Sequence, residues 1–163
     1  MTPTDPIVEH SRRLIEKGSK SFASAARIFE PETRASAYML YGWCRHCDDE
    51  IDGQELGFGQ PAGASDPVAA LARLRAGTLA ALAGRGDGPV FAALQRVVEK
   101  HAIPSRHPLE LLDGFAMDVG GRRYVTIEDT LDYCYHVAGV VGVMMAMIMG
   151  VRDRATLNRA SDL

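Results

Sequence analysis

The sequence has little of what marks a secreted, nucleic-acid-binding or β-rich protein. It contains three cysteines, an odd number, and shows no secretory leader, so we expect reduced thiols in a cytoplasmic setting rather than a disulfide framework. Its formal net charge of -3 gives no support to a DNA or RNA partner. No alternating apolar and polar pattern of useful length appears, which favours an all-α fold.

The sequence also lacks an apolar run long enough to cross a bilayer. The most apolar stretch, Val137 to Val151, falls short of the ~20 residues that a membrane span needs, and we interpret it as a buried core helix. Contact with a membrane surface stays open, because a soluble enzyme can take a lipid substrate from one. The length of 163 residues and the apolar fraction of 47% indicate one domain with a real core.

Proline, glycine and capping residues divide the chain into segments with a helical period. The helices expected run from Pro31 to Asp52, Val68 to Ala83, Pro89 to His101, His107 to about Val119, and from a cap at Thr126 to about Met149. The glycine- and proline-rich stretch from Gly53 to Pro67 predicts a loop. No helix is predicted for the polar residues at the start of the chain.

The first of these helices places four functional side chains along one line. At about 100° per residue, a wedge of about 60° contains Tyr41, Arg45, Asp48 and Asp52. The line beside it is apolar and must face the core; it consists of Leu40, Cys44, Cys47 and Ile51. The polar line therefore borders the core.

Two carboxylates one turn apart, Asp48 and Asp52, can share a hard cation, and Asp49 can support them through a water. Magnesium fits this best, with manganese as an alternative, because Mg²⁺ is typically held by one or two carboxylates together with substrate phosphates. Arg45, one turn back, would donate to phosphate oxygens.

The spacing alone leaves other interpretations open. Asp and Arg at helical intervals are also typical of a solvated, salt-bridged face. Cys44 and Cys47 form a Cys-x-x-Cys pair, but they lie on the apolar line without a matching second pair, so we interpret them as small buried hydrophobes rather than zinc or redox ligands.

Two motifs in order resemble the squalene and phytoene synthase family. The first comprises Ser19-Lys20-Ser21-Phe22, Pro31, Arg34, Leu40-Tyr41, Cys44-Arg45 and Asp48-Asp49-Glu50-Ile51-Asp52. The second, Tyr133-Cys134-Tyr135-His136-Val137-Ala138-Gly139-Val140-Val141-Gly142, follows more than eighty residues later. The residues around Trp43 look most similar to the bacterial phytoene synthases within the family.

The resemblance implies an all-α isoprenoid synthase bundle, of which residues 1–163 would be the N-terminal portion. It implies a prenyltransferase that condenses two geranylgeranyl diphosphates head-to-head to phytoene, through a cyclopropyl (prephytoene) diphosphate, in carotenoid biosynthesis. NADPH is not expected for that reaction. A squalene-type synthase using farnesyl diphosphate stays open as an alternative, and the resemblance leaves the oligomeric state unknown.

The resemblance also implies roles for individual residues. Asp48 and Asp52, supported by Asp49, match the magnesium positions, while Arg45 and Tyr41 match diphosphate contacts. The flap that closes over the diphosphate corresponds to Ser19 and Ser21, and an aromatic wall to Phe22. The lining for the prenyl tails corresponds to Tyr133, Val137, Ala138, Val141 and Gly142, although ordinary core packing would give the same pattern.

Two further polar groups receive structural interpretations. Glu128 and Asp132 project away from Val137, so we expect a solvated face there. Asp118, Arg122, Arg123 and Tyr124 form a cluster whose expected role is to fix a loop.

The family's second aspartate-rich motif does not occur within the 163 residues. The resemblance therefore leaves two hypotheses for this chain: a portion of a magnesium-dependent synthase, or a non-catalytic module that binds diphosphate without turnover.

Overall fold

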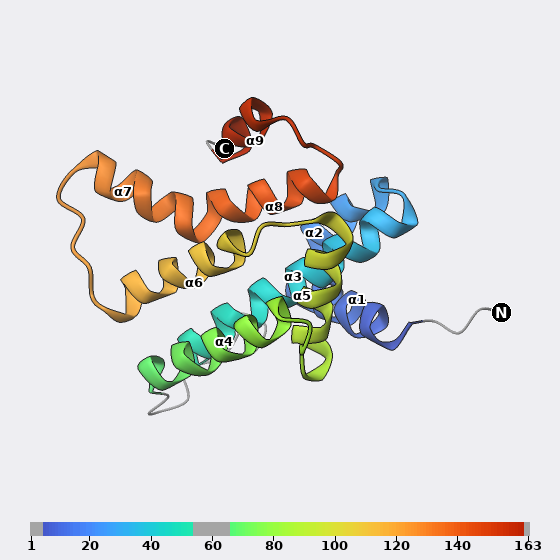
Figure 1. The fold of residues 1–163 in the computed structure, drawn as a ribbon, viewed down its shortest axis with the longest axis horizontal. Helices are drawn as coiled ribbons and strands as arrows, with labels where there is room; N and C mark the ends of the chain where they lie inside the picture. Colours follow the sequence, from blue (N-terminus) through green and yellow to red (C-terminus); the bar gives the residue numbers. More distant parts are fainter. Residues whose placement is uncertain (1–4, 54–65, 162–163) are drawn as a thin grey trace.

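The computed structural model describes residues 5–53 and 66–161, which form helices and no strand (Figure 1). In chain order these are α1 (Pro6–Gly18), α2 (Lys20–Ala25), a 3-10 turn (Ala26–Ile28), α3 (Pro31–Asp52), α4 (Pro67–Leu82), α5 (Gly88–His101), α6 (Arg106–Val119), α7 (Ile127–Cys134), a π-helical turn (Tyr135–Gly139), α8 (Val140–Ile148) and α9 (Arg154–Ala160). The all-α prediction is confirmed.

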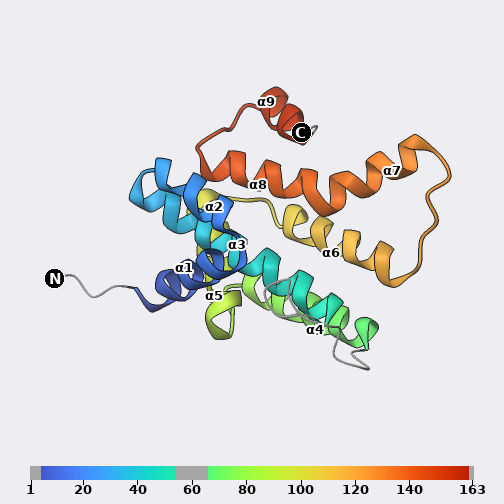
Figure 2. The same cartoon turned by 180° about the vertical axis from the view of Figure 1, so that it is seen from behind.

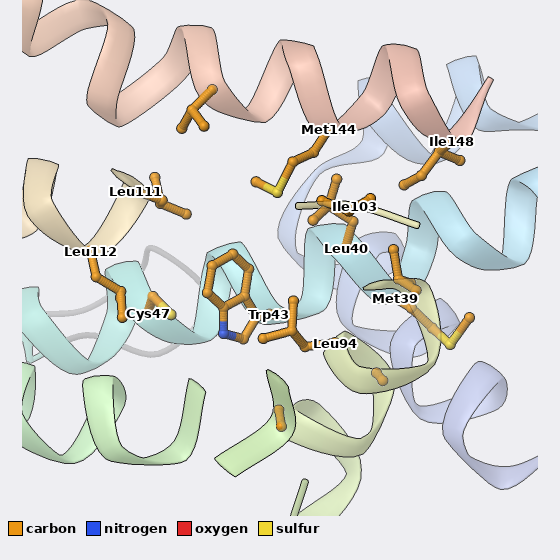
Figure 3. Close-up of a cluster of buried hydrophobic side chains, with 14 of the residues drawn as sticks. Met39, Leu40, Trp43, Cys47, Leu94, Ile103, Leu111, Leu112, Met144 and Ile148 are labelled. Carbon is orange, nitrogen blue, oxygen red and sulfur yellow. The ribbon is translucent and has the colours of Figure 1, made fainter. Parts of the chain in front are cut away.

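Helix α3 is the element around which the others pack. Pro31 occupies its first turn, and Gly53 ends it in the left-handed region at φ 65°. It contacts α1, α4, α5, α6 and α8. Trp43 is fully buried at its centre, and Figure 3 shows Leu94 from α5 and Met144 from α8 beside the indole. The four-residue polar line is therefore carried by the most constrained helix of the molecule.

The helix predicted from Thr126 to about Met149 is continuous, but it contains a π-helical turn that the sequence pattern did not predict. At its start the Asp129 N–H donates to Thr126 Oγ1 at 3.1 Å and the Thr126 N–H donates to Asp129 Oδ2 at 3.1 Å, a complete capping box. Within the described residues, Ile127–Ile148 is the one helix long and apolar enough to cross a membrane, so the expectation that no segment reaches this length was wrong: the helix begins well before the apolar stretch from Val137. Val140 and Met144 are buried completely, so its second half is a core helix.

The predicted loop from Gly53 to Pro67 lies mostly outside the described residues, which exclude 54–65. Pro67 itself begins α4, because the Asp66 side chain accepts from the Val68 and Ala69 N–H groups and caps the helix, so the loop prediction was wrong at this residue.

Helices α1 and α9 went unpredicted because each is short or largely polar. In α1 the aliphatic positions Ile7, Val8, Leu14 and Ile15 are few, yet Ile15 is 3% exposed. Helix α9 is held by an Asp153 cap and lies on the far side of α8 from α6, as Figures 1 and 2 both show. Their stability comes from docking rather than from intrinsic helix propensity.

A buried histidine should make the stability of this fold depend on pH. The Ser36 hydroxyl donates to the Glu32 carbonyl, so the His101 Nε2–H donates to Ser36 Oγ at 2.8 Å. Burial, and then the charges of Lys100 and Arg152, lower the pKa of His101 below its ordinary value of 6.5. The unfolded chain therefore binds the proton more tightly, and the neutral histidine stabilises the fold above about pH 6.5.

We expect the urea concentration at the midpoint of unfolding to decrease when the pH is lowered from about 7.5 to about 5.5. The decrease should be smaller in the His101→Gln variant, which keeps a hydrogen-bond donor but cannot titrate. An identical pH dependence in the two proteins would show that His101 does not contribute it.

Candidate functional site

A cavity of about 760 Å³ lies between α3, α6 and the α7–α8 helix, with α2 at its side. This volume is within the range of small-molecule sites. Its walls are mainly apolar, and the residues that line it are Ile15, Phe22, Ala25, Ala26, Phe29, Ala37, Leu40, Tyr41, Cys44, Arg45, Asp48, Leu111, Phe115, Asp118, Tyr133, Val137, Ala138, Val141, Gly142 and Met145. A few polar groups gather where α3 and α6 meet it.

Helix α3 supplies the polar groups of the cavity. Arg45 Nη1 lies 2.5 Å from Asp48 Oδ2 and 3.8 Å from Asp49 Oδ1. The Arg45 Nε and the Tyr41 hydroxyl are both buried without a well-aligned hydrogen-bond partner among the described residues. Buried donors of this kind are normally satisfied, and because both residues line the cavity, acceptor oxygens of a ligand bound there would satisfy them.

Carboxylates converge on Asp48. Burial raises the pKa of the Asp48 carboxyl, Arg45 lowers it, and the negative charges of Asp52, Asp49 and Asp118 raise it again. Asp118 enters from α6, so the acidic groups come from more than one helix. Such crowding of negative charge is relieved when a cation binds.

Tyr133 joins the same end of the cavity through Asp118. Its hydroxyl donates to Asp118 Oδ2 at 3.0 Å, and burial together with this carboxylate raises the pKa of Tyr133 to about 12. The Tyr124 ring lies 4.9 Å from the Tyr133 ring, and Arg122 lies over Tyr124 while pairing with Asp132 at 2.9 Å. The expected structural role of this cluster is confirmed for Arg122, but Asp118 also lines the cavity.

Most of the predicted site residues meet at this cavity. Those that line it are Phe22, Tyr41, Arg45, Asp48, Tyr133, Val137, Ala138, Val141 and Gly142. The sequence analysis missed Asp118 as a cavity residue, because its distance to Asp48 depends on how α6 packs against α3. It also missed the contribution of Ile15, since α1 was not predicted.

The remaining predicted residues lie outside the cavity lining. Ser19 caps α2 by accepting from the Phe22 N–H at 3.3 Å, and Ser21 is exposed next to it. Asp52 is exposed at the end of α3, and Asp49 lines a separate groove on the other side of that helix. The roles predicted for these four residues stay predictions.

The cysteine interpretation is confirmed for Cys47, whereas Cys44 is partly buried and lines the cavity. Cys47 is fully buried, and burial raises the pKa of its thiol; burial, and then the charge of Asp48, raises the pKa of Cys44 to about 12. Thiols held protonated in this way are poor metal ligands and nucleophiles.

The donor set fits a divalent cation only in combination with a ligand. No group of three or more His, Cys, Asp or Glu side chains within 5–53 and 66–161 is arranged to hold a metal ion alone. Asp48 and Asp52 are carboxylates one turn apart on α3, which suits Mg²⁺ shared with substrate phosphates.

The fold is that of part of an isoprenoid synthase. The structure superimposes on a squalene synthase from Alicyclobacillus acidocaldarius with a TM-score of 0.81 and 29% identity, covering 95% of this chain and 56% of that one. A dehydrosqualene synthase solved in complex with a ligand superimposes with a TM-score of 0.80 and 26% sequence identity. That comparison covers 95% of this chain and 51% of the other.

A family profile described as squalene/phytoene synthase matches residues 15–163, and the chain belongs to that family. It is 57% identical to a phytoene synthase of Pseudescherichia vulneris and 54% identical to a 15-cis-phytoene synthase of a Paracoccus strain, over 97% and 96% of its own length. In both comparisons it spans 52% of the relative, about half.

The Tyr133–Asp118 pair makes a first prediction about the site. Asp118→Asn removes the negative charge beside the phenol but leaves its burial, so the pKa of Tyr133 should fall from about 12 toward, without reaching, about 10. The shift is measured by an NMR titration of labelled tyrosine. Asp113→Asn, which removes a carboxylate paired with Arg75 on another face, should leave Tyr133 unchanged. Equal titration of Tyr133 in wild type and Asp118→Asn would contradict the assignment.

Proposed function

We propose that this chain is part of a phytoene synthase, a prenyltransferase that condenses two geranylgeranyl diphosphates head-to-head to phytoene through prephytoene diphosphate. The observation that carries the proposal is that the polar groups Arg45, Asp48 and Tyr41, with Asp118 and Tyr133 beside them, gather at one end of a mainly apolar cavity. A prenyl diphosphate has the same division, with a charged head and a long hydrocarbon tail. The names of the two bacterial relatives support phytoene as the product, and with it a role in carotenoid biosynthesis.

The head of the substrate would bind at α3. Arg45 has a fork of donors beside the Tyr41 hydroxyl, and among the described residues neither Arg45 Nε nor that hydroxyl has a well-aligned hydrogen-bond partner. Charge-assisted hydrogen bonds to diphosphate oxygens would satisfy both groups. They would also stabilise the negative charge that develops as the carbon–oxygen bond breaks.

A divalent cation would complete the head site. Mg²⁺, with Mn²⁺ as a substitute, would be held by Asp48 and Asp52 with Asp49 in support, and would supply positive charge to the leaving diphosphate. The carboxylates around Asp48 supply the charge that holds the ion, and Arg45 keeps the Asp48 side chain in place.

The tail would lie along α8 and the π-helical turn. Val137, Ala138, Val141 and Gly142 present a wall without charged groups, and Phe22 lies with its ring edge toward Tyr41, the centroids 6.1 Å apart. An apolar wall keeps water away from a carbocation, which would otherwise be captured as an alcohol. Ser19 and Ser21 would close over the head from α2.

A squalene-type reaction on farnesyl diphosphate is less well supported. The chain is 29% and 26% identical to the squalene and dehydrosqualene synthases, against 57% and 54% to the two phytoene synthases. The proposed phytoene reaction ends in the loss of a proton, so it would need no NADPH.

A second candidate is a module that binds prenyl diphosphate without turnover. The observation behind it is that, within the described ranges, no group of three or more His, Cys, Asp or Glu side chains is arranged to hold a metal ion alone. Incubation of the chain with geranylgeranyl diphosphate and Mg²⁺ separates the synthase from the non-catalytic module. Release of diphosphate with formation of phytoene would exclude the non-catalytic module.

Binding at the head site tests both candidates. Asp48→Asn should weaken the Mg²⁺-dependent affinity for a non-ionisable geranylgeranyl thiolodiphosphate by about tenfold or more in calorimetry, because a charged ligand is lost. Asp113→Asn, a matched change on α6, should bind like wild type. Wild-type affinity in Asp48→Asn would place the head elsewhere.

We also propose a cytoplasmic protein that contacts a membrane surface through the end of α7. Val125, Ile127 and Leu131 are 85%, 63% and 60% exposed. Ile127 and Leu131 lie one turn apart on α7, and Val125 immediately precedes that helix, at the end of the molecule where α6 is joined to α7 (Figure 2). Such an apolar group can insert into the lipid interface, where prenyl substrates reside.

Vesicle co-sedimentation tests the membrane contact. The double change Val125→Ser and Leu131→Ser should reduce the bound fraction several-fold, since about two apolar side chains are removed from the contact. Val68→Ser, which removes an equally exposed side chain from α4, should bind as wild type does. Equal binding of all three proteins would exclude this surface.

A further inference from the structure

The π-helical turn from Tyr135 to Gly139 interrupts the helix that forms the tail wall. Within it the Val140 N–H donates to the Tyr135 carbonyl, five residues earlier. Such turns are rare, and they occur mainly as single wide turns at functional sites. Residues on both sides of this one line the cavity: Tyr133 before it and Val141 after it.

The turn keeps the cavity-lining residues in register. Tyr133, Val137, Val141 and Met145 are spaced by four, and in an α-helix each step of four rotates by about 400°, so the row drifts by about 40° per step. Over three steps the row would turn by about 120°, away from the cavity. A wide turn rotates less per residue and removes part of this drift.

A partly buried polar cluster joins α6 to the wide turn. The Tyr135 hydroxyl donates to Glu110 Oε2 at 2.7 Å, and His107 Nδ1 lies 3.0 Å from the same oxygen. His107 is 4% exposed, and we name these three residues the Glu110 cluster. Hydrogen bonds to a partly buried carboxylate are among the strongest available to a tyrosine.

The backbone of α6 reinforces the same contact. One turn after Glu110, a Cβ added at Gly114 would lie 2.9 Å from Val137 Cγ1 and 3.1 Å from the His136 carbonyl carbon. Only glycine allows this approach without displacement of the turn. The wide turn is therefore fixed to α6 both through the Glu110 cluster and through close packing at Gly114.

We propose that Glu110, Tyr135 and His107 are positioning residues that hold the π-helical turn and so determine the length of prenyl tail that the cavity accepts. None of the three lines the cavity, so they would act through Val137 and Val141 rather than by touching substrate. The tail-length part rests on the proposed function; the effect on the turn does not.

Two measurements on the 163-residue chain test the proposal. In Tyr135→Phe and Glu110→Ala, amide hydrogen exchange of the segment 133–142 should accelerate by about tenfold, because a hydrogen bond to a charged group is lost. In the same variants the preference for geranylgeranyl over farnesyl thiolodiphosphate should change by about threefold or more, while affinity for Mg²⁺ with inorganic diphosphate stays unchanged.

Matched variants separate positioning from general damage. Tyr38→Phe removes a hydroxyl that makes no hydrogen bond within the described residues, so exchange and tail preference should both stay as in wild type. Glu110→Gln keeps an acceptor oxygen for Tyr135, so it should restore most of the exchange protection that Glu110→Ala loses. Unchanged exchange in Tyr135→Phe, or faster exchange with an unchanged tail preference, would overturn the proposal. If Asp48→Asn binds the analogues normally while the Glu110 variants lose tail preference, the proposed head site fails and this inference stands.

Discussion

The burial of Trp43 on α3 is the constraint on which the site depends. A fully buried indole is surrounded by side chains from several helices, so α3 can neither rotate nor slide without opening the core. Tyr41, Arg45 and Asp48 lie on the same helix at the edge of that core. Their positions at the end of the cavity follow from packing that has nothing to do with their own chemistry.

That arrangement explains why charged groups remain beside an apolar cavity. Arg45 and Asp48 pair with each other at 2.5 Å, which limits the cost of placing both away from bulk water. The pairing is incomplete, because Arg45 Nε and the Tyr41 hydroxyl have no well-aligned hydrogen-bond partner in the part of the chain that the structure describes. A site whose polar groups are only partly satisfied is one that gains free energy when an anionic ligand and a cation bind together.

The sequence predicted well the features that depend on local spacing. The course of α3 and the helix from Thr126 could be foreseen because caps, glycine and periodicity are properties of neighbouring residues. The cavity-lining residues of the second motif were predicted through family resemblance, since periodicity alone could not separate a cavity wall from core. Asp118 was not foreseen as a neighbour of Asp48, because that proximity depends on the packing of α6 against α3. The π-helical turn was missed for the same reason: its hydrogen bond to Glu110 spans twenty-five residues.

The central claim is that one ligand spans the charged end of the cavity and its apolar wall. The most direct measurement is a crystal structure of the chain with Mg²⁺ and geranylgeranyl thiolodiphosphate. The account predicts diphosphate oxygens within hydrogen-bond distance of Arg45 and the Tyr41 hydroxyl, with the tail along Val137 and Val141. A tail lying outside this cavity, or a diphosphate bound away from α3, would contradict it.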